Sequence, residues 1–137
     1  MDRFLLLATL GYLGHRVGDF MLQSREVAEG KANRNLEGLV LCTKHVVIYT
    51  FCVCLFWTTA NPVVIAAVAI PHWVIDHFSL AKVWAMKVGG RSIERAREIE
   101  DPKLREIEST RTVNNIKDVD QTMHFLCLAA VLWLIPF

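Results

Sequence analysis

The chain has 137 residues, of which 53% are hydrophobic and 21% are charged, and its formal net charge is +1. This length supports one domain or one small helical bundle. The near balance of Lys and Arg against Asp and Glu gives no electrostatic reason to expect a nucleic-acid partner. The large apolar fraction excludes a disordered chain, and its combination with so many charges disfavours an ordinary water-soluble enzyme.

Four apolar blocks follow one another along the chain, at about residues 4–23, 36–58, 62–82 and 119–137. Each holds about 20 residues, enough to span a hydrocarbon core of ~30 Å as a helix. None of the blocks alternates polar and apolar residues as a half-buried strand would. The sequence therefore predicts an all-α fold, in which residues 1–137 form a single integral membrane domain built as a four-helix transmembrane bundle.

A long charged link, at about residues 83–118, joins the third and fourth blocks. Ser92 is expected to cap a helical turn that runs through Glu100. Asp101 and Pro102 form a favourable N-cap and first-turn pair, which predicts the start of a second helix. Residues 91–118 hold seven cations and seven anions, a pattern typical of a solvated surface. A cytosolic protein partner at this link stays open as an alternative.

The positive charges are confined to two segments of the chain. Thirteen of the fifteen Lys and Arg residues lie within 24–44 and 82–117, and only Arg3 and Arg16 lie elsewhere. With four crossings, both segments fall on one side of the membrane, and the positive-inside rule makes that side cytoplasmic. We therefore expect a multi-pass protein of the cytoplasmic (inner) membrane, with both termini outside and the charged links in the cytoplasm.

Ionisable groups are rare inside membrane-spanning blocks, and those present are candidates for function. Here they form pairs four residues apart, a spacing that places both members on one face of a helix. The pairs are His15 with Asp19, His72 with Asp76 and Asp120 with His124, and the second block adds His45 with Tyr49. Counted along each helix from its cytoplasmic end, at ~1.5 Å per residue, these groups lie in one layer.

Histidine nitrogens and aspartate oxygens are ligands that zinc takes, and carboxylates bridge the ions of two-metal sites. The expected cofactor is a divalent metal, with zinc as the first choice. The expected metal ligands are His15, His45, His72, Asp76, Asp120 and His124. The expected catalytic groups are Asp19, Asp76, Asp120 and Tyr49. Arg16, Gln23 and Lys82 are expected to hold the substrate or to orient the ligands.

Several motifs resemble one known family. H-R-V-G-D-F-M-L-Q at residues 15–23, then Lys31 and H-V-V-I-Y at residues 45–49, resemble the start of a small bacterial and phage membrane family. P-H-W-V-I-D at residues 71–76 with Lys82, and Asp120-Gln121 with His124, resemble its later motifs. The family is catalogued only as domain of unknown function 3307. The resemblance covers nearly the whole chain and implies a membrane protein of a bacterium or phage, but no particular reaction.

The leading prediction is a metal-dependent, hydrolase-like site in the cytoplasmic half of the bundle. Its expected substrate is a lipid-linked or phosphorylated small molecule. Two alternatives stay open: a proton- or ion-coupled transporter, and a structural or signalling membrane protein that works through its charged link. Membrane lipids are expected partners, and a homo-oligomer stays open.

Overall fold

The structure is a computed structural model that describes residues 2–135. Within that range the chain forms helices and no strand, which confirms the predicted all-α class. The elements are α1 (Arg3–Arg16), a π-helical segment η1 (Val17–Met21), α2 (Arg25–Gly30), α3 (Leu36–Phe56), α4 (Pro62–His77), α5 (Leu80–Lys87), α6 (Ile93–Arg97) and α7 (Pro102–Leu134).

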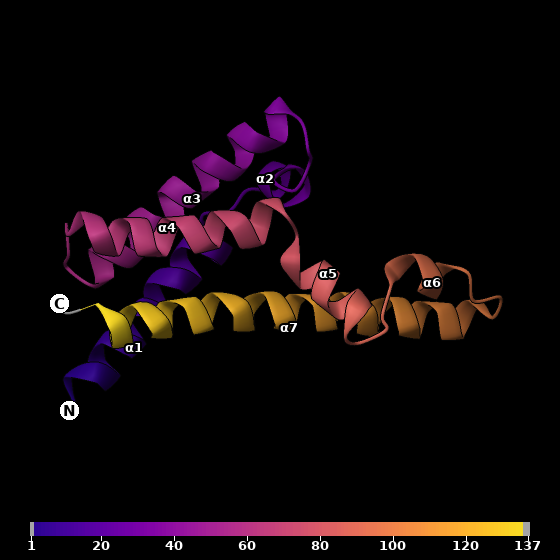
Figure 1. The fold of residues 1–137 in the computed structure, drawn as a ribbon. Coiled ribbons are helices and arrows are strands. Elements are labelled where there is room, and N and C mark those ends of the chain that lie inside the picture. The colour runs from indigo at the N-terminus through magenta and orange to yellow at the C-terminus, as the bar shows by residue number, and fades with distance from the viewer. Residues whose placement is uncertain (1, 136–137) are drawn as a thin grey trace.

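Helix α7 is the long rod on which the other helices are arranged (Figure 1). Helices α1 and α4 pack against its C-terminal half, and α3 packs against both of them. Helices α5 and α6 pack against the N-terminal half of α7, beyond the bundle. The two ends of the chain lie at the same end of the molecule (Figure 1). The molecule is therefore a four-helix bundle from which a smaller helical extension projects.

The close packing of α1 and η1 on α3 depends on glycine. A Cβ atom at Gly14 would lie 2.8 Å from the Cα of Val53, and one at Gly18 would lie 2.8 Å from the Cα of Tyr49. These separations are too short for any side chain, so the helix backbones can meet only where the side chain is a hydrogen atom. The glycines thereby bring the N-terminal segment up to the side of α3 that carries Tyr49 and Val53.

The charged link is largely helical. Helix α7 begins at Pro102, and the side chain of Asp101 accepts hydrogen bonds from the backbone N–H groups of Lys103 and Leu104, which confirms the predicted start. Helix α6 is shorter than the expected turn from Ser92 to Glu100. No Gly or Pro interrupts residues 103–134, so α7 continues for 33 residues from the link into the fourth apolar block.

The third apolar block is not one helix, contrary to the prediction. Helix α4 ends at His77, Ser79 adopts a left-handed conformation with φ 49°, and α5 begins at Leu80. The axes of α4 and α5 differ by 57°. The left-handed residue ends α4 because a right-handed helix cannot continue through it.

The four-span transmembrane bundle is not supported by helix length and composition. Among the described residues, α3 is long and apolar enough to cross a membrane, and α4 with α5 passes the same test only as one bent span. Helix α1 has 14 residues. The fourth block is the end of a helix whose first half is charged, and its last two residues, 136 and 137, lie outside the described range.

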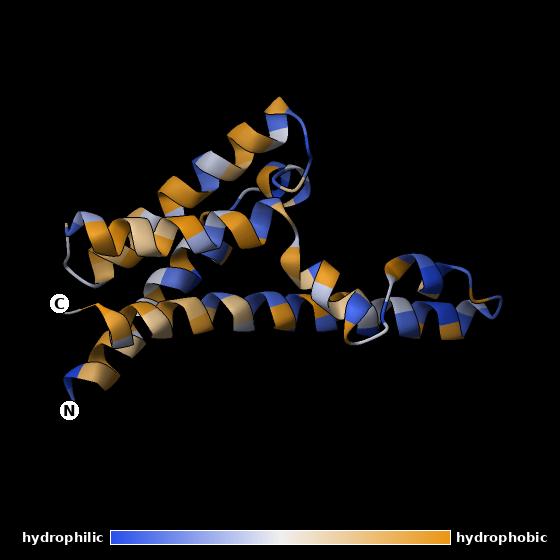
Figure 2. Ribbon diagram, in the orientation of Figure 1, coloured by the Kyte–Doolittle hydropathy of each residue, from blue (hydrophilic) through white to orange (hydrophobic). Residues whose placement is uncertain are grey.

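Apolar and charged residues occupy opposite ends of the molecule. In Figure 2 hydrophobic colour prevails on α1, α3, α4 and the C-terminal half of α7, whereas α6 and the start of α7 are mostly hydrophilic. A buried apolar cluster joins α3, α4 and α7 near the end that holds the termini. It contains Tyr49, Val53, Trp57, Val64, Val68, Leu128 and Val131. The buried histidines and aspartates lie between this cluster and the charged end.

Candidate metal centre

Four side chains from three segments converge at one buried point of the bundle. Asp19 comes from η1, His45 from α3, and His72 and Asp76 from α4. One nitrogen or carboxylate oxygen from each lies within 4.8 Å of the others, and all four residues are buried. All four belong to the set predicted to form the site.

The Nε2 atom of His45 is the centre of this arrangement. It lies 3.1 Å from Asp19 Oδ1, 3.1 Å from His72 Nε2 and 3.3 Å from Asp76 Oδ2. His72 Nε2 is also 3.2 Å from Asp76 Oδ2. A single N–H on His45 cannot serve all these neighbours, and two neutral imidazole nitrogens gain nothing by facing carboxylates with their lone pairs. A cation bound among the four atoms would satisfy all of them.

The π-helical segment η1 positions Asp19. The backbone N–H of Leu22 donates to the carbonyl oxygen of Val17, five residues earlier, so this turn is wider than an α-helical one. Gly18, inside the same turn, lies against the backbone of Tyr49 on α3. The wide turn and the missing side chain together place the Asp19 carboxylate beside His45. Single-turn π segments of this kind are frequent at functional sites.

Lys31 supplies a positive charge that the site prediction did not include. Its Nζ lies 2.7 Å from Asp76 Oδ2 and 3.9 Å from Asp19 Oδ1, and its side chain is only 15% exposed. Lys31 follows the short helix α2, whose N-cap is Ser24. Lys31 shares no helix with either aspartate, so helical spacing could not link it to them. In the sequence it was noted only as part of the family motifs.

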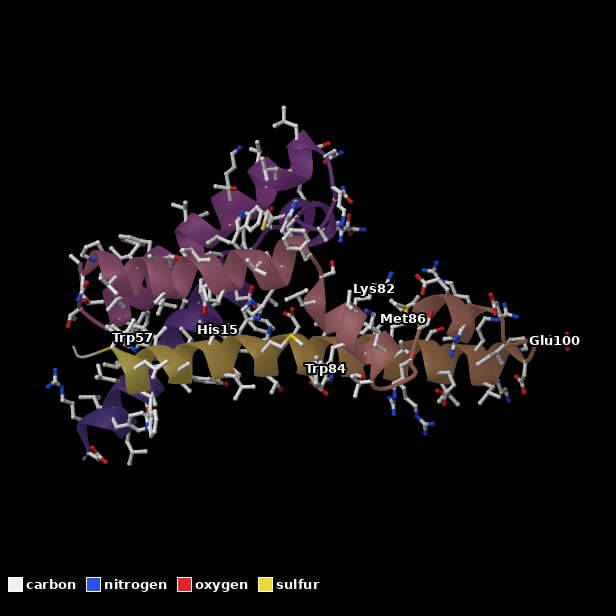
Figure 3. The ribbon with its side chains drawn as sticks, in the orientation of Figure 1. His15, Trp57, Lys82, Trp84, Met86 and Glu100 are labelled. Carbon is white, nitrogen blue, oxygen red and sulfur yellow. The ribbon has the colours of Figure 1, made fainter. Side chains whose placement is uncertain are left out.

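A chain of hydrogen bonds holds Asp19 from the other side. Gln121 Nε2 donates to Asp19 Oδ2 over 3.1 Å, and Gln121 Oε1 lies 2.7 Å from His15 Nε2, which therefore donates to it. The hydroxyl of Tyr49 lies 3.3 Å from His15 Nδ1 and donates to that nitrogen. His15, which Figure 3 shows inside the bundle, was predicted as a metal ligand but lies outside both groups of converging ligand atoms. It contacts Asp19 through Gln121, a residue of the family motifs that the site prediction did not include.

The ring of Tyr49 also packs against the centre. It stacks on the ring of His72 with centroids 3.6 Å apart and an interplanar angle of 22°. Tyr49 is 1% exposed, so its hydroxyl is placed by protein groups and not by solvent. Tyr49 therefore connects His15 with His72 and fixes the plane of one converging imidazole.

A second group of ligand atoms adjoins the first and shares Asp76. It contains Asp76, Asp120 and His124, again with one atom from each within 4.8 Å of the others. His124 Nε2 lies 3.7 Å from Asp76 Oδ1, the oxygen that does not face His45. Both predicted residues of α7 thus meet the histidines of α3 and α4 through Asp76.

A cavity of about 280 Å³ opens beside these groups, between α2, α4, α5, α6 and α7. Asp76 and Asp120 line it, and so do three lysines: Lys31, Lys82 and Lys117. The side chain of Asp120 is 27% exposed, whereas that of Asp76 is 1% exposed. The cavity is thus where solvent or a small molecule reaches the buried cluster.

The three residues predicted to hold substrate or orient ligands lie in different places. Gln23 Nε2 is 3.3 Å from His45 Nε2, at the edge of the first group. Lys82 lines the cavity, and its Nζ pairs with Glu94 at 3.0 Å. Arg16 is exposed, and its guanidinium lies 3.8 Å from the ring centroid of Phe20, away from the cavity lining.

Comparison with known proteins identifies the family of this chain. A family model described as Protein of unknown function (DUF3307) matches residues 5–136. The chain belongs to the DUF3307 family. The match includes every residue of the two ligand groups and confirms the resemblance found in the motifs. No curated protein and no solved structure matches the chain. The description of DUF3307 assigns no reaction.

Proposed function

We propose that this protein is a metal-dependent hydrolase whose centre is formed by Asp19, His45, His72 and Asp76. One observation carries the proposal: His45 Nε2 lies within 3.3 Å of three further potential ligand atoms, all of them buried. Burying two carboxylates and two imidazoles together is costly unless a positive charge compensates them. Lys31 compensates part of this charge, and a divalent cation would compensate the rest.

Two imidazole nitrogens and two carboxylate oxygens form a donor set that suits Zn²⁺, with Mn²⁺ as the next choice. A divalent ion held by these groups would supply a Lewis acid and a water nucleophile at neutral pH. The chain itself contributes the positioning. Lys31 holds Asp76, Gln121 holds Asp19, and Tyr49 stacks on His72.

The cavity supports a phosphorylated substrate. Lys82 and Lys117 line it together with Asp76 and Asp120, so an anionic group in the cavity would meet both positive charge and potential metal ligands. Lysine binds phosphate as a point charge and needs no special geometry. Lys117 has no ion-pair partner among residues 2–135, whereas Lys82 pairs with Glu94. A phosphate ester is the substrate class that this wall suits best.

The exposed apolar side chains support placement in a membrane. Large hydrophobic residues are exposed on all four helices of the bundle, among them Leu5, Phe51, Ile70, Leu126 and Trp133. A water-soluble monomer rarely exposes so many large apolar side chains. We place the apolar half of the molecule in the cytoplasmic membrane of a bacterium. The cation-rich α5, α6 and start of α7 then lie in the cytoplasm, where the cavity opens.

The transport alternative requires a polar path from the centre to the opposite face. The segment between the centre and the chain termini is instead filled by the apolar cluster of α3, α4 and α7. The geometry therefore favours hydrolysis over ion or proton transport. Flux of protons or ions through proteoliposomes that contain the protein would reverse this preference.

The test of the proposed function is the zinc content of the detergent-purified protein. The wild-type chain is expected to retain zinc through dialysis, and the His72→Ala variant is expected to lose it. His77→Gln is the matched control, because His77 is buried on the same helix but belongs to neither ligand group. Zinc-dependent hydrolysis of p-nitrophenyl phosphate should follow the same order. A wild-type protein that binds no zinc, or no better than His72→Ala, would refute the proposal.

A further inference from the structure

His124 presents an unpaired nitrogen to the interior of the bundle. Its side chain is 1% exposed, and its Nδ1 lies 2.8 Å from the backbone carbonyl oxygen of Asp120. A carbonyl only accepts, so Nδ1 carries the proton and Nε2 of the neutral ring is left with its lone pair. Nε2 is buried and has no hydrogen-bond partner among the described residues. This arrangement, with the N–H on a backbone carbonyl, is common for histidines that bind metals.

The group that faces this lone pair is also an acceptor. Asp76 Oδ1 lies 3.7 Å from His124 Nε2, too far for a hydrogen bond and facing it with lone pairs of its own. Two lone-pair donors directed at each other in a buried place repel unless a cation lies between them. The contact between His124 and Asp76 therefore indicates a cation in the same way as the contacts of His45 do.

Asp76 uses its two oxygens for two different groups. Oδ2 lies 3.3 Å from His45 Nε2 and 3.2 Å from His72 Nε2, whereas Oδ1 faces His124. A carboxylate with its oxygens divided in this way is the usual bridge between the ions of a two-metal site. Asp120 completes the second group and, unlike the four residues of the first group, is partly exposed to the cavity.

We infer that the protein binds a second divalent cation, ligated by Asp76, Asp120 and His124 and bridged to the first by the Asp76 carboxylate. The inference rests on the proposed function and deepens it. The first ion is enclosed by buried residues, and the second one borders the cavity. A pair of ions about 3.5–4 Å apart would stabilise both the attacking and the leaving oxygen of a phosphate ester. The second ion is therefore the one that the substrate would reach first.

The experiment counts metal ions per chain in the full-length protein, purified in detergent and loaded with zinc. The wild type is expected to hold two zinc ions, and His124→Ala and Asp120→Asn one each. Asp120→Asn is included because Asp120 is partly exposed, so that its loss leaves the core intact. Cys127→Ala is the matched control: Cys127 lies one turn beyond His124 on α7 and is itself a chemically able zinc ligand outside both groups. It should keep two ions.

A second measurement establishes whether the ions are neighbours. Protein loaded with Mn²⁺ is expected to give an exchange-coupled spectrum by electron paramagnetic resonance, since bridged ions lie about 3.5–4 Å apart. In Asp120→Asn the spectrum should become that of an isolated ion.

The outcomes separate this inference from the proposed function. One zinc ion in the wild type, lost in His72→Ala but kept in Asp120→Asn, refutes the second ion and leaves the first centre standing. Two ions that persist in both His124→Ala and Asp120→Asn, or two ions without exchange coupling, also refute the bridged pair. A wild type without any bound zinc refutes both the first centre and the second.

Discussion

Lys31 Nζ lies 2.7 Å from Asp76 Oδ2, so a residue just after α2 compensates a carboxylate that α4 buries. The same ammonium lies 3.9 Å from Asp19 Oδ1. Lys31 thus provides part of the charge compensation that a bound cation would complete, and the two together hold α4 and η1 around one point.

Lys31→Met should lower the stability of the metal-free protein by ~3 kcal/mol, the order found when one partner of a buried ion pair is removed. Zinc should raise the melting temperature of this variant by more than that of the wild type, because the ion then neutralises carboxylates that Lys31 no longer pairs. Thermal unfolding with and without zinc measures both effects. Equal zinc-induced shifts in variant and wild type would show that Lys31 and the metal do not share these carboxylates.

Gln121→Leu should weaken zinc binding by roughly 10- to 100-fold, as removal of a residue that orients a metal ligand usually does. The variant breaks the hydrogen-bond chain from His15 to Asp19 but keeps the volume of the side chain. Competition with a fluorescent zinc chelator measures the affinity. Thr122→Ala, at the next and exposed position of α7, is the control and should bind zinc as the wild type does.

Gly18→Ala should destabilise the protein by about 1–3 kcal/mol, because the added Cβ meets the backbone of Tyr49 and η1 must move away from α3. The same movement separates Asp19 from His45, so zinc affinity should fall as well. Gly11→Ala meets the side chain of Trp57, two turns away from the site, and should lower stability alone. Zinc affinity that falls equally in both variants would mean that the effect of Gly18 is not local.

Inorganic phosphate should inhibit hydrolysis of p-nitrophenyl phosphate, and Lys117→Ala should raise the inhibition constant about tenfold. The reason is the loss of one charge-assisted contact from the cavity wall. Lys87→Ala removes a cation from α5 that does not line the cavity and should leave the constant unchanged. Inhibition that is identical in the two variants would place the phosphate elsewhere.

The contact between α5 and α6 should persist in acid. A hydrogen bond from Ser92, one from the backbone of Glu94 itself and one from Lys82 lower the pKa of Glu94 to about 2. Since the folded pKa lies below that of a free carboxyl, the stabilising contribution is complete above the ordinary pKa and is lost as the pH falls through about 2. An NMR titration of Glu94 measures this, and Lys82→Ala should raise its pKa whereas Lys87→Ala should not.

Much of the site could be predicted from local spacing. His72 and Asp76 are four residues apart on one helix, and the structure places their side chains 3.2 Å apart, as the period of an α-helix requires. The start of α7 could be predicted in the same way. The side chain of Asp101 caps the helix by accepting hydrogen bonds from the N–H groups of Lys103 and Leu104, which is a local interaction. Counting residues from the cytoplasmic end of each helix also placed His45 in the same layer as His72, although α3 and α4 run in opposite directions.

Local spacing did not decide which group each side chain joins where the backbone departs from a regular helix. His15 Nε2 and Asp19 Oδ2 lie 3.9 Å apart, as their four-residue spacing predicts. In the π-helical segment, however, Asp19 also faces His45, whereas His15 faces Gln121. The turn at Ser79 likewise divides the third apolar block, residues 62–82, which composition predicts to be one helix. Such local departures are stabilised by tertiary packing and leave little trace in hydrophobic periodicity.

The sequence by itself determined the helical class, the separation of apolar from charged residues, and the pairs of histidine and aspartate that share a helix face. Those features depend on interactions between residues a few positions apart. Only the tertiary structure decided which pairs meet, that Lys31 and Gln121 complete the cluster, and that Asp76 directs one oxygen to each ligand group. The physical reason is that these contacts join segments up to 102 residues apart, whose relative positions are set by helix packing and the glycine contacts between α1, η1 and α3.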